Sequence, residues 1–226
     1  MININAFDGD LLQESIISKE RGHLAQITKP SCISHSSVLE EAALKILVTY
    51  ASSEGHTRKI GRQVADRIAH AGHAVELLNL ADASDIDVSG FDGVILAASV
   101  HVSHYQRSLT EFAARQSKPL NDIQTLFLSV SLAAAGHDTE DWKGLDRIVN
   151  DLVEATGWTP NRVEHIAGAY LPSQYDIFRR FIMRKIIVRN DPSADPSSDH
   201  DYTDWRALDG VIDSWLSALG CQNTPV

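Results

Sequence analysis

The stretch ILVTYASSEGHTRKIGRQVADRIA, residues 46–69, joins two different hydrophobic patterns. It begins inside a continuous apolar run at 45–50, which is typical of a strand covered on both faces of a sheet. After the polar break SSEGHT, apolar Ile60, Val64 and Ile68 recur at the spacing of one helix face, and Gly72 follows as a stop signal. We therefore expect a strand at 45–50 and a helix over 56–72.

The alternation of strand and helix patterns continues along the chain. Further strands are expected at 74–80, 91–99, 125–132 and 161–170, and helices at 108–117, 141–157 and 203–220. The last helix has Asp204 as its expected N-cap and Gly220 as its stop signal. Strands that alternate with helices indicate a parallel sheet, so the sequence predicts an α/β, flavodoxin-like doubly wound sheet of five parallel strands.

Other segments of the chain differ in composition. Residues 1–43 are polar with weak periodicity, so we expect an N-terminal extension outside the main fold and a candidate for disorder. Residues 45–220 are expected to form one domain. Within it, residues 175–190 are apolar and basic together, and residues 191–203 form a linker rich in Pro, Ser and Asp.

Composition excludes several classes of protein. The 226 residues carry a formal net charge of −10, which argues against a general nucleic-acid binder. The two cysteines, Cys32 and Cys221, show no metal-ligand spacing, so no metal site or disulfide framework is expected. Because no secretory signal and no run of about 18 apolar residues is visible, we expect a cytoplasmic protein. The sequence leaves open whether the protein forms a homo-oligomer.

The polar break SSEGHT lies between the first strand and the first helix, where open α/β sheets hold their ligands. Free N–H groups and the helix dipole favour an anion at this place. The hydroxyls of Ser52, Ser53 and Thr57 add donors, and Gly55 permits a tight turn. The alternative is that these hydroxyls only cap the helix.

The ligand class follows from what this loop lacks. It contains neither the Gly-Lys-Ser/Thr of a Walker A loop nor GxGxxG, which disfavours ATP and dinucleotides. A mononucleotide bound without a lysine points to FMN. The expected phosphate-binding residues are Ser52, Ser53, Glu54, Gly55, His56 and Thr57.

Two later loops leave strands at the same edge and should complete the FMN site. His101, His104 and Tyr105 are expected to flank the isoalloxazine ring, and Ser99 and Ser131 to offer polar contacts. The alternative for each histidine is an ordinary surface position. The predicted contacts from these loops are Ser99, Val100, His101, His104, Tyr105, Ser131, Leu132, Ala133 and Gly136.

Six motifs occur in a recognisable order between Lys45 and Leu219: TYASSEGHT, ILAASVHVSHY, FLSVSLAA, GWTPNRVEHIAGAY, YDIFRRFIMRKI and DYTDW. In this order they resemble the flavodoxin-type, menaquinone-dependent protoporphyrinogen dehydrogenases. The first motif marks only the wider flavodoxin superfamily, whereas HYQRSL, IAGA before a tyrosine, FIMRKI and YTDW are more specific. Where known members of that family carry a basic, proline-containing insertion, this chain has the acidic stretch 133–144.

The resemblance implies a flavoprotein that binds FMN noncovalently and needs no catalytic side chain or metal. It implies oxidation of protoporphyrinogen IX to protoporphyrin IX in heme biosynthesis, with the electrons passed to a quinone. The basic segment 175–190 would then hold the substrate's propionates, because arginine binds a carboxylate with two hydrogen bonds. The residues expected there are Arg179, Arg180, Arg184 and Lys185.

Alternatives stay open for the segment and for the whole protein. The segment 175–190 could lie on the inner face of the cell membrane as a peripheral contact, or pack on the domain as an ordinary amphipathic helix. The protein could be a flavodoxin-type electron carrier or an NAD(P)H:quinone reductase. A receiver domain is disfavoured, because the first strand ends in Ser-Ser rather than in an acidic cluster.

Overall fold

The computed structural model describes residues 43–53, 55–82, 86–174, 193, 195 and 197–223. Its central sheet has the strand order β2-β1-β3-β5-β6, and neighbouring strands run parallel. These strands are β1 (Lys45–Ala51), β2 (Ala74–Asn79), β3 (Gly93–His101), β5 (Gln124–Ser131) and β6 (Arg162–Ala167). This order is that of a flavodoxin-like doubly wound sheet, so the predicted fold is confirmed.

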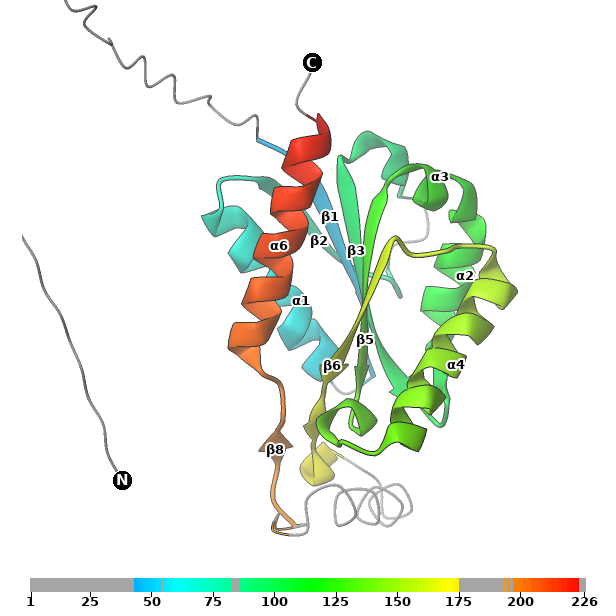
Figure 1. Cartoon of the computed structure of the whole chain (residues 1–226), viewed down its shortest axis with the longest axis vertical. Helices are drawn as coiled ribbons and strands as arrows, with labels where there is room; N and C mark the ends of the chain where they lie inside the picture. Colours follow the sequence, from blue (N-terminus) through cyan, green and yellow to red (C-terminus); the bar gives the residue numbers. More distant parts are fainter. Residues whose placement is uncertain are drawn as a thin grey trace, which may run out of the picture. The chain divides into compact units, whose positions relative to one another are not determined.

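Helices cover both faces of the sheet (Figure 1). On one face lie α1 (His56–His70) and α6 (Trp205–Asn223), and on the other lie α2 (Arg107–Arg115), α3 (Ser117–Asp122) and α4 (Thr139–Thr156). Short 3-10 turns are η1 (Val88–Gly90), η2 (Ala133–Ala135) and η3 (Pro172–Gln174). The two-residue strand β4 (His104–Tyr105) pairs with β3, while β7 (Ala169–Tyr170) pairs with β8 (His200–Asp201) in a separate small sheet.

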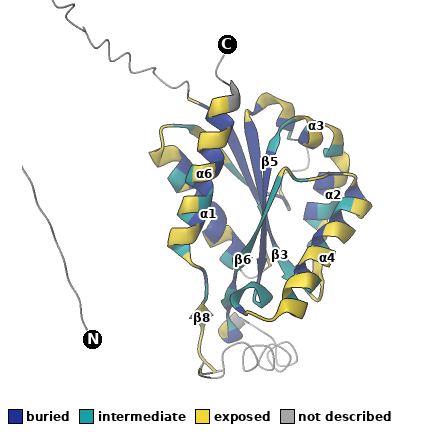
Figure 2. Ribbon diagram, in the orientation of Figure 1, coloured by how far each residue is buried: buried dark blue, intermediate teal, exposed yellow. Residues whose placement is uncertain are grey.

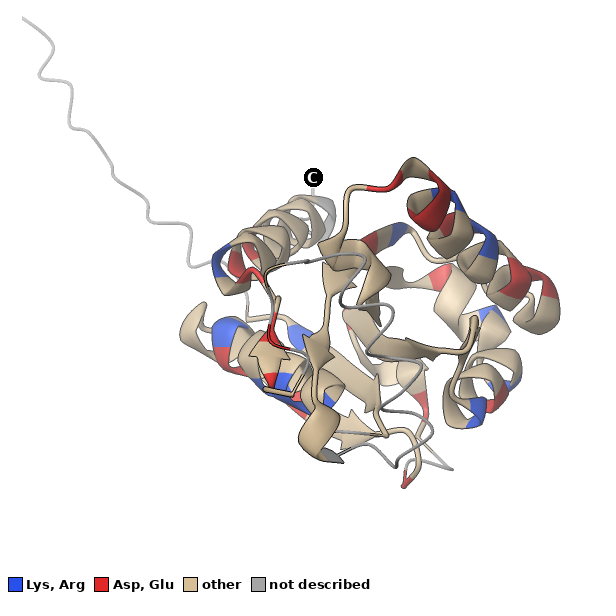
Figure 3. Cartoon of the chain, turned by 90° about the horizontal axis from the view of Figure 1, so that it is seen from below, with Lys and Arg blue, Asp and Glu red and all other residues tan. Residues whose placement is uncertain are grey.

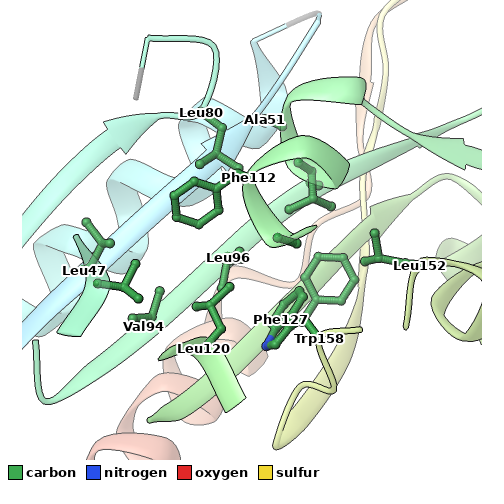
Figure 4. Packing of buried hydrophobic residues seen from close by; sticks show 14 of the residues in the cluster. Leu47, Ala51, Leu80, Val94, Leu96, Phe112, Leu120, Phe127, Leu152 and Trp158 are labelled. Carbon is green, nitrogen blue, oxygen red and sulfur yellow. The ribbon is translucent and has the colours of Figure 1, made fainter. Parts of the chain in front are cut away.

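The sheet is the buried layer of the domain (Figure 2). Leu47 belongs to the core cluster under α2, α3 and α4, whereas its neighbours Ile46 and Val48 belong to the cluster under α1 and α6. Figure 4 shows part of the first cluster, in which Phe127 meets Trp158 edge-on with ring centroids 5.6 Å apart. Burial on both faces explains why the strands are continuous apolar runs in the sequence.

The expected strand 161–170 is interrupted at Gly168. β6 ends at Ala167, and after Gly168 the residues Ala169 and Tyr170 pair with β8 instead of continuing beside β5. A Cβ at Gly168 would lie 3.3 Å from the Val130 side chain, so the chain passes close to β5 here. Residues 191–203 were expected to form a linker, but His200 and Asp201 within this range form the strand β8.

Other element boundaries also differ from the expectation. The expected helix 108–117 ends at Arg115, and α3 follows as a helix that the pattern did not predict, with Pro119 in its first turn, where proline is tolerated. α6 begins after Asp204, whose carboxylate accepts from Ala207 N–H at 2.9 Å, which confirms the predicted cap. The helix continues past Gly220 to Asn223. The predicted extension 1–43 lies outside the described residues apart from Ala43.

Candidate functional site

The candidate site lies where the strand order of the sheet reverses. β1 connects through α1 on one face to β2, and β3 connects through α2 on the other face to β5. Ligands of open α/β sheets bind at such a switch point, outside the carboxyl ends of the strands. The stretches 52–57, 102–106 and 132–138 follow β1, β3 and β5 at this edge. Figure 3 views the chain from below and shows charged residues mainly on the surrounding helices.

The first turn of α1 begins without a side-chain cap among the described residues. Its N-cap residue is Gly55, which has a left-handed backbone with φ 86° and ψ −15°. The helical ladder starts with Lys59 N–H donating to the Gly55 carbonyl at 3.1 Å, so the N–H groups of residues 56–58 precede the ladder. Ser52 Oγ accepts from Gly55 N–H at 3.0 Å and closes the turn instead of capping the helix. Among the described residues this disfavours the capping alternative for Ser52.

The other predicted phosphate residues differ in exposure. Ser53 is exposed, whereas Thr57 is 1% exposed in the first turn of α1. Glu54 lies outside the described residues. The His56 side chain is 11% exposed and turns toward Thr203, in the segment that precedes α6. Contact of these residues with a phosphate stays a prediction.

His56 belongs to a hydrogen-bonded cluster that joins α1 to the segment between β8 and α6. His56 Nε2 lies 2.8 Å from Thr203 Oγ1 and 3.6 Å from Asp201 Oδ1. Thr203 Oγ1 donates to the Ala167 carbonyl at 2.7 Å, and Lys59 Nζ donates to Asp201 Oδ2 at 2.8 Å. Trp205 covers the cluster, with its ring edge-on to the imidazole and 4.6 Å from Lys59 Nζ. We name these residues the α1–α6 clamp.

Burial and the hydrogen bonds and charges of the clamp shift the pKa values of His56 and Asp201. Burial lowers the pKa of His56; the Asp201 carboxylate opposes this change and Lys59 adds to it. Burial acts to raise the pKa of Asp201, but hydrogen bonds from Lys59 and Thr203 outweigh it, and the pKa lies below its ordinary value. At neutral pH the free clamp therefore holds an uncharged imidazole beside an ionised carboxylate.

The loop after β3 is a tight hairpin. Val102 and Ser103 connect β3 to β4 with φ 48° and 61°, the left-handed pair of a type I′ turn. Val102 is 94% exposed, and left-handed backbone is uncommon for a β-branched residue. His104 Nδ1 donates to the Val102 carbonyl at 2.8 Å, while the predicted Val100 pairs with Tyr105 across the hairpin. Strained residues of this kind cluster at functional sites.

A polar group lies at the base of this hairpin. Ser99 Oγ lies 2.9 Å from His101 Nε2, and Gln106 Nε2 donates to the same hydroxyl. Gln106 Oε1 is buried and has no hydrogen-bond partner among the described residues. An unpaired buried acceptor of this kind costs about 1–3 kcal/mol, so a ligand donor reaching it would offset that cost.

Tyr105 points into the core rather than away from the domain. Its hydroxyl lies 2.8 Å from Ser129 Oγ, and its ring meets Phe127 edge-on with centroids 5.1 Å apart. Burial raises the pKa of Tyr105 to about 12, although the bond with Ser129 acts against this. The predicted contact of Tyr105 with a flavin ring stays a prediction.

The loop after β5 is a compact turn. Ser131 Oγ accepts from Ala134 N–H at 3.1 Å, and Gly136 N–H donates to the Ala133 carbonyl at 3.1 Å. The turn is tied to α4 because Trp142 Nε1 donates to the Gly136 carbonyl at 3.0 Å. Leu132 packs against Tyr170 of β7. The structure thus holds this predicted loop beside the end of β5.

The predicted substrate or membrane contacts Arg179, Arg180, Arg184 and Lys185 lie outside the described residues. The chain on either side of them is held together. β7 pairs with β8, and Ser173 Oγ donates to Asp199 at 2.8 Å. Of the described helices, none combines the length and hydropathy that crossing a membrane requires.

Sequence reasoning missed Gln106 and the clamp residues Lys59, Asp201 and Thr203. Gln106 stands in HYQRSL and Thr203 in YTDW, so the motifs marked these positions without indicating what they contact. His56 and Thr203 are 147 residues apart in the chain, and no local pattern reports such a pair.

The sequence of this chain is similar to those of several known proteins. The family model described as a flavodoxin domain matches residues 47–197. Over 165 residues the chain is 25% identical to the protein named protoporphyrinogen IX dehydrogenase (quinone) of Escherichia coli strain K12, covering 73% of this chain and 91% of that protein. A protein of the same name from Leishmania major is 23% identical, with 73% and 71% covered.

Solved structures of similar proteins include a flavodoxin from the domain Archaea. It is 11% identical, covers 78% of this chain and 99% of its own, and has a TM-score of 0.46. Oxidised flavodoxin 1 from Bacillus cereus is 12% identical, with 76% and 97% covered and a TM-score of 0.44. Because the family model matches more than half of the sequence, the chain belongs to the flavodoxin domain family.

Proposed function

We propose that this chain is an FMN-dependent oxidoreductase that oxidises protoporphyrinogen IX to protoporphyrin IX and passes the electrons to a quinone. The observation that carries the proposal is the uncapped first turn of α1, opening at the switch point of a flavodoxin-family sheet. The names of the relatives from Escherichia coli and Leishmania major support this choice of substrate and acceptor.

The residues present at the switch point fit FMN. N–H groups of residues 56–58 precede the helical ladder and, with the positive end of the helix dipole, suit the phosphate. The left-handed Gly55 keeps side-chain atoms away from this turn, since it has no Cβ. The buried Gln106 Oε1, which has no hydrogen-bond partner in the described part of the chain, offers an acceptor to an N–H or O–H group of a ligand. When bound, FMN would supply the redox chemistry.

The protein's own groups would bind and orient the flavin. The β3–β4 hairpin carries His101 and His104, and its tight turn fixes their backbone. The turn after β5, tied to α4 by Trp142, supplies Ala133 and Gly136 on the neighbouring strand end. These two loops are expected to face the ring, while the turn at Gly55 binds the phosphate.

The basic segment 175–190 is proposed to meet the anionic groups of the substrate. Its arginines can each bind a propionate with two hydrogen bonds. The β7–β8 pair and the Ser173–Asp199 bond hold the two sides of this segment together next to the end of β6. The described residues on either side of the segment, Ser173 and Asp199, therefore lie together, which supports a segment that begins close to the end of β6.

The first experiment is to purify the protein and test it for FMN. Yellow protein that releases FMN on heating supports the cofactor. Oxidation of protoporphyrinogen IX, followed by porphyrin fluorescence, is then measured with and without menaquinone. Fast NAD(P)H oxidation without porphyrinogen turnover would favour a quinone reductase, and FMN binding with neither activity would favour an electron carrier. Protein that stays colourless when titrated with FMN would contradict the proposal.

A single substitution tests the phosphate turn. Thr57→Ala removes a buried hydroxyl from the first turn of α1 and should weaken FMN retention. Thr156→Ala is the matched control, because it removes a buried hydroxyl from the last turn of α4. Equal FMN affinity in the two variants would count against a role of Thr57.

A further inference from the structure

The α1–α6 clamp fixes the state of His56. Thr203 has one hydroxyl proton and gives it to the Ala167 carbonyl, because a carbonyl oxygen can only accept. The short contact with His56 therefore requires the imidazole to donate from Nε2. Asp201 Oδ1, 3.6 Å from the same nitrogen, favours a proton there as well. In the neutral ring, Nδ1 carries the lone pair and is the atom that takes up a second proton.

His56 is also the first residue of α1, next to the N–H groups that the proposed function assigns to the FMN phosphate. Nδ1 is bonded to Cγ, so it lies closer to the backbone of residue 56 than Nε2 does. A proton at Nδ1 would bring a positive charge to the side of the ring nearest these N–H groups.

We propose that Thr203 and Asp201 are positioning residues for His56, and that binding of the FMN phosphate is coupled to protonation of His56 at Nδ1. This inference rests on the proposed function, because it needs the phosphate at the first turn of α1. The coupling is reciprocal: the phosphate strengthens the proton affinity of His56, and the proton strengthens FMN binding by the same factor.

The charges around His56 set the direction of this coupling. Among the described residues, the charged groups facing the ring are Lys59 from its own helix and Asp201 from β8, while α6 contributes the ring of Trp205. In the free protein, burial favours the neutral imidazole. A phosphate dianion at the helix terminus favours the charged form and adds to the attraction of Asp201. Protonated His56 would then lie between two anionic groups.

The coupling is measured as protons taken up on binding. FMN is titrated into the protein by calorimetry in buffers of low and high ionisation enthalpy, neither containing phosphate. If the phosphate raises the proton affinity of His56 tenfold, the wild type takes up at most about half a proton per FMN, at the pH midway between the two titrations. The FMN dissociation constant then rises by up to about tenfold as pH increases through this range.

His56→Gln separates this effect from titration of the FMN phosphate itself, whose second pKa is about 6. The glutamine amide can still donate to Thr203 but cannot take up a proton near neutral pH. Proton uptake attributable to the protein should disappear in this variant, while the contribution of the phosphate remains. Riboflavin, which has no phosphate, should bind the wild type without proton uptake.

Two further variants test the positioning role. Thr203→Val removes the hydroxyl that accepts from His56 and should reduce uptake, whereas Thr203→Ser should restore it. Gln63→Ala is the matched control, because Gln63 donates to Asp209 at 2.9 Å and joins the same two helices further from the loop. Its proton uptake should equal that of the wild type.

The outcomes separate this inference from the proposed function. Uptake that is present in the wild type, lost in His56→Gln, reduced in Thr203→Val and kept in Thr203→Ser supports the coupling. Tight FMN binding with the same net proton change in the wild type and in His56→Gln overturns the coupling and leaves the cofactor assignment intact. Protein that binds no FMN at any pH overturns both.

Discussion

Replacing Gly55 by alanine alters the turn on which the proposed phosphate site depends. Gly55 has φ 86°, and a Cβ built on it meets nothing within 4 Å. The substitution therefore introduces backbone strain without a steric clash, about 1–2 kcal/mol for a residue with a Cβ in this conformation. For a chain of this size, that loss lowers Tm by about 2–8 °C.

Gly72 provides a matched control at the other end of α1. It has φ 90°, and a Cβ there also meets nothing within 4 Å, so Gly72→Ala should destabilise the protein by a similar amount. Only Gly55 precedes the N–H groups assigned to the phosphate. If alanine forces residue 55 out of the left-handed region, one hydrogen bond to the phosphate is lost. Such a bond is worth about 1.5–3 kcal/mol, which corresponds to about tenfold to hundredfold weaker FMN binding.

The assay compares two quantities in the two variants. Urea or thermal unfolding measures the stability loss, and quenching of FMN fluorescence measures the dissociation constant. The expected result is an equal loss of stability in Gly55→Ala and Gly72→Ala, with weakened FMN binding confined to Gly55→Ala. Equal FMN affinity in both variants would refute the assignment of this turn to the phosphate.

Further predictions concern the core, a buried phenol and the basic segment. Gly93→Ala places a Cβ 2.7 Å from the Trp215 ring, and this overpacking should cost about 1–3 kcal/mol in urea unfolding. Burial raises the pKa of Tyr105 to about 12, so the unfolded state ionises first as pH rises. Between pH 10 and 12 the wild type should therefore lose about 2 kcal/mol more stability than Tyr105→Phe, measured by urea unfolding at each pH. Arg180→Ala with Arg184→Ala should raise KM for protoporphyrinogen IX or abolish sedimentation with anionic vesicles. Unchanged behaviour in both assays would favour an ordinary packed helix.

Local sequence patterns predicted the layers of this fold well, because each pattern reports what one element buries. The spacing of Ile60, Val64 and Ile68 predicted the buried face of α1, and all three are fully buried. Continuous apolar runs predicted strands covered on both faces, and the sheet is indeed covered by helices on both sides. The alternation of strands and helices predicted a parallel, doubly wound sheet, and the structure confirms it.

Sequence patterns did not predict the structure where contacts between distant parts of the chain override local preference. Residues 161–170 give the pattern of one uninterrupted strand, so the sequence did not show that the chain leaves β5 after Ala167 and pairs with β8. β8 itself lies in a polar stretch with no strand pattern. At the candidate site, the sequence indicated a hydroxyl-rich anion loop, but it could not show that His56 turns toward Thr203 and that Gly55 takes the cap position.

The packing of α6 along α1 links the end of the chain to the proposed phosphate turn. Successive side-chain contacts join the two helices: Gln63 with Asp209 at 2.9 Å, and Arg67 with Asp213 at 2.7 Å. The Arg67–Asp213 pair is partly exposed and contributes little free energy by itself, since exposed pairs are worth about 0–1 kcal/mol.

The stability of this contact comes instead from apolar burial. Leu208, Ile212, Trp215 and Leu219 of α6 are buried against the sheet and α1, and burial of such side chains is worth about 1.5–3 kcal/mol each. The polar pairs therefore fix how α6 is aligned on α1, while the apolar stripe holds it there. Because the clamp at His56 continues the same line of contacts, α6 helps to orient the N–H groups at the start of α1. The geometry proposed to bind the FMN phosphate thus depends on residues at both ends of the domain.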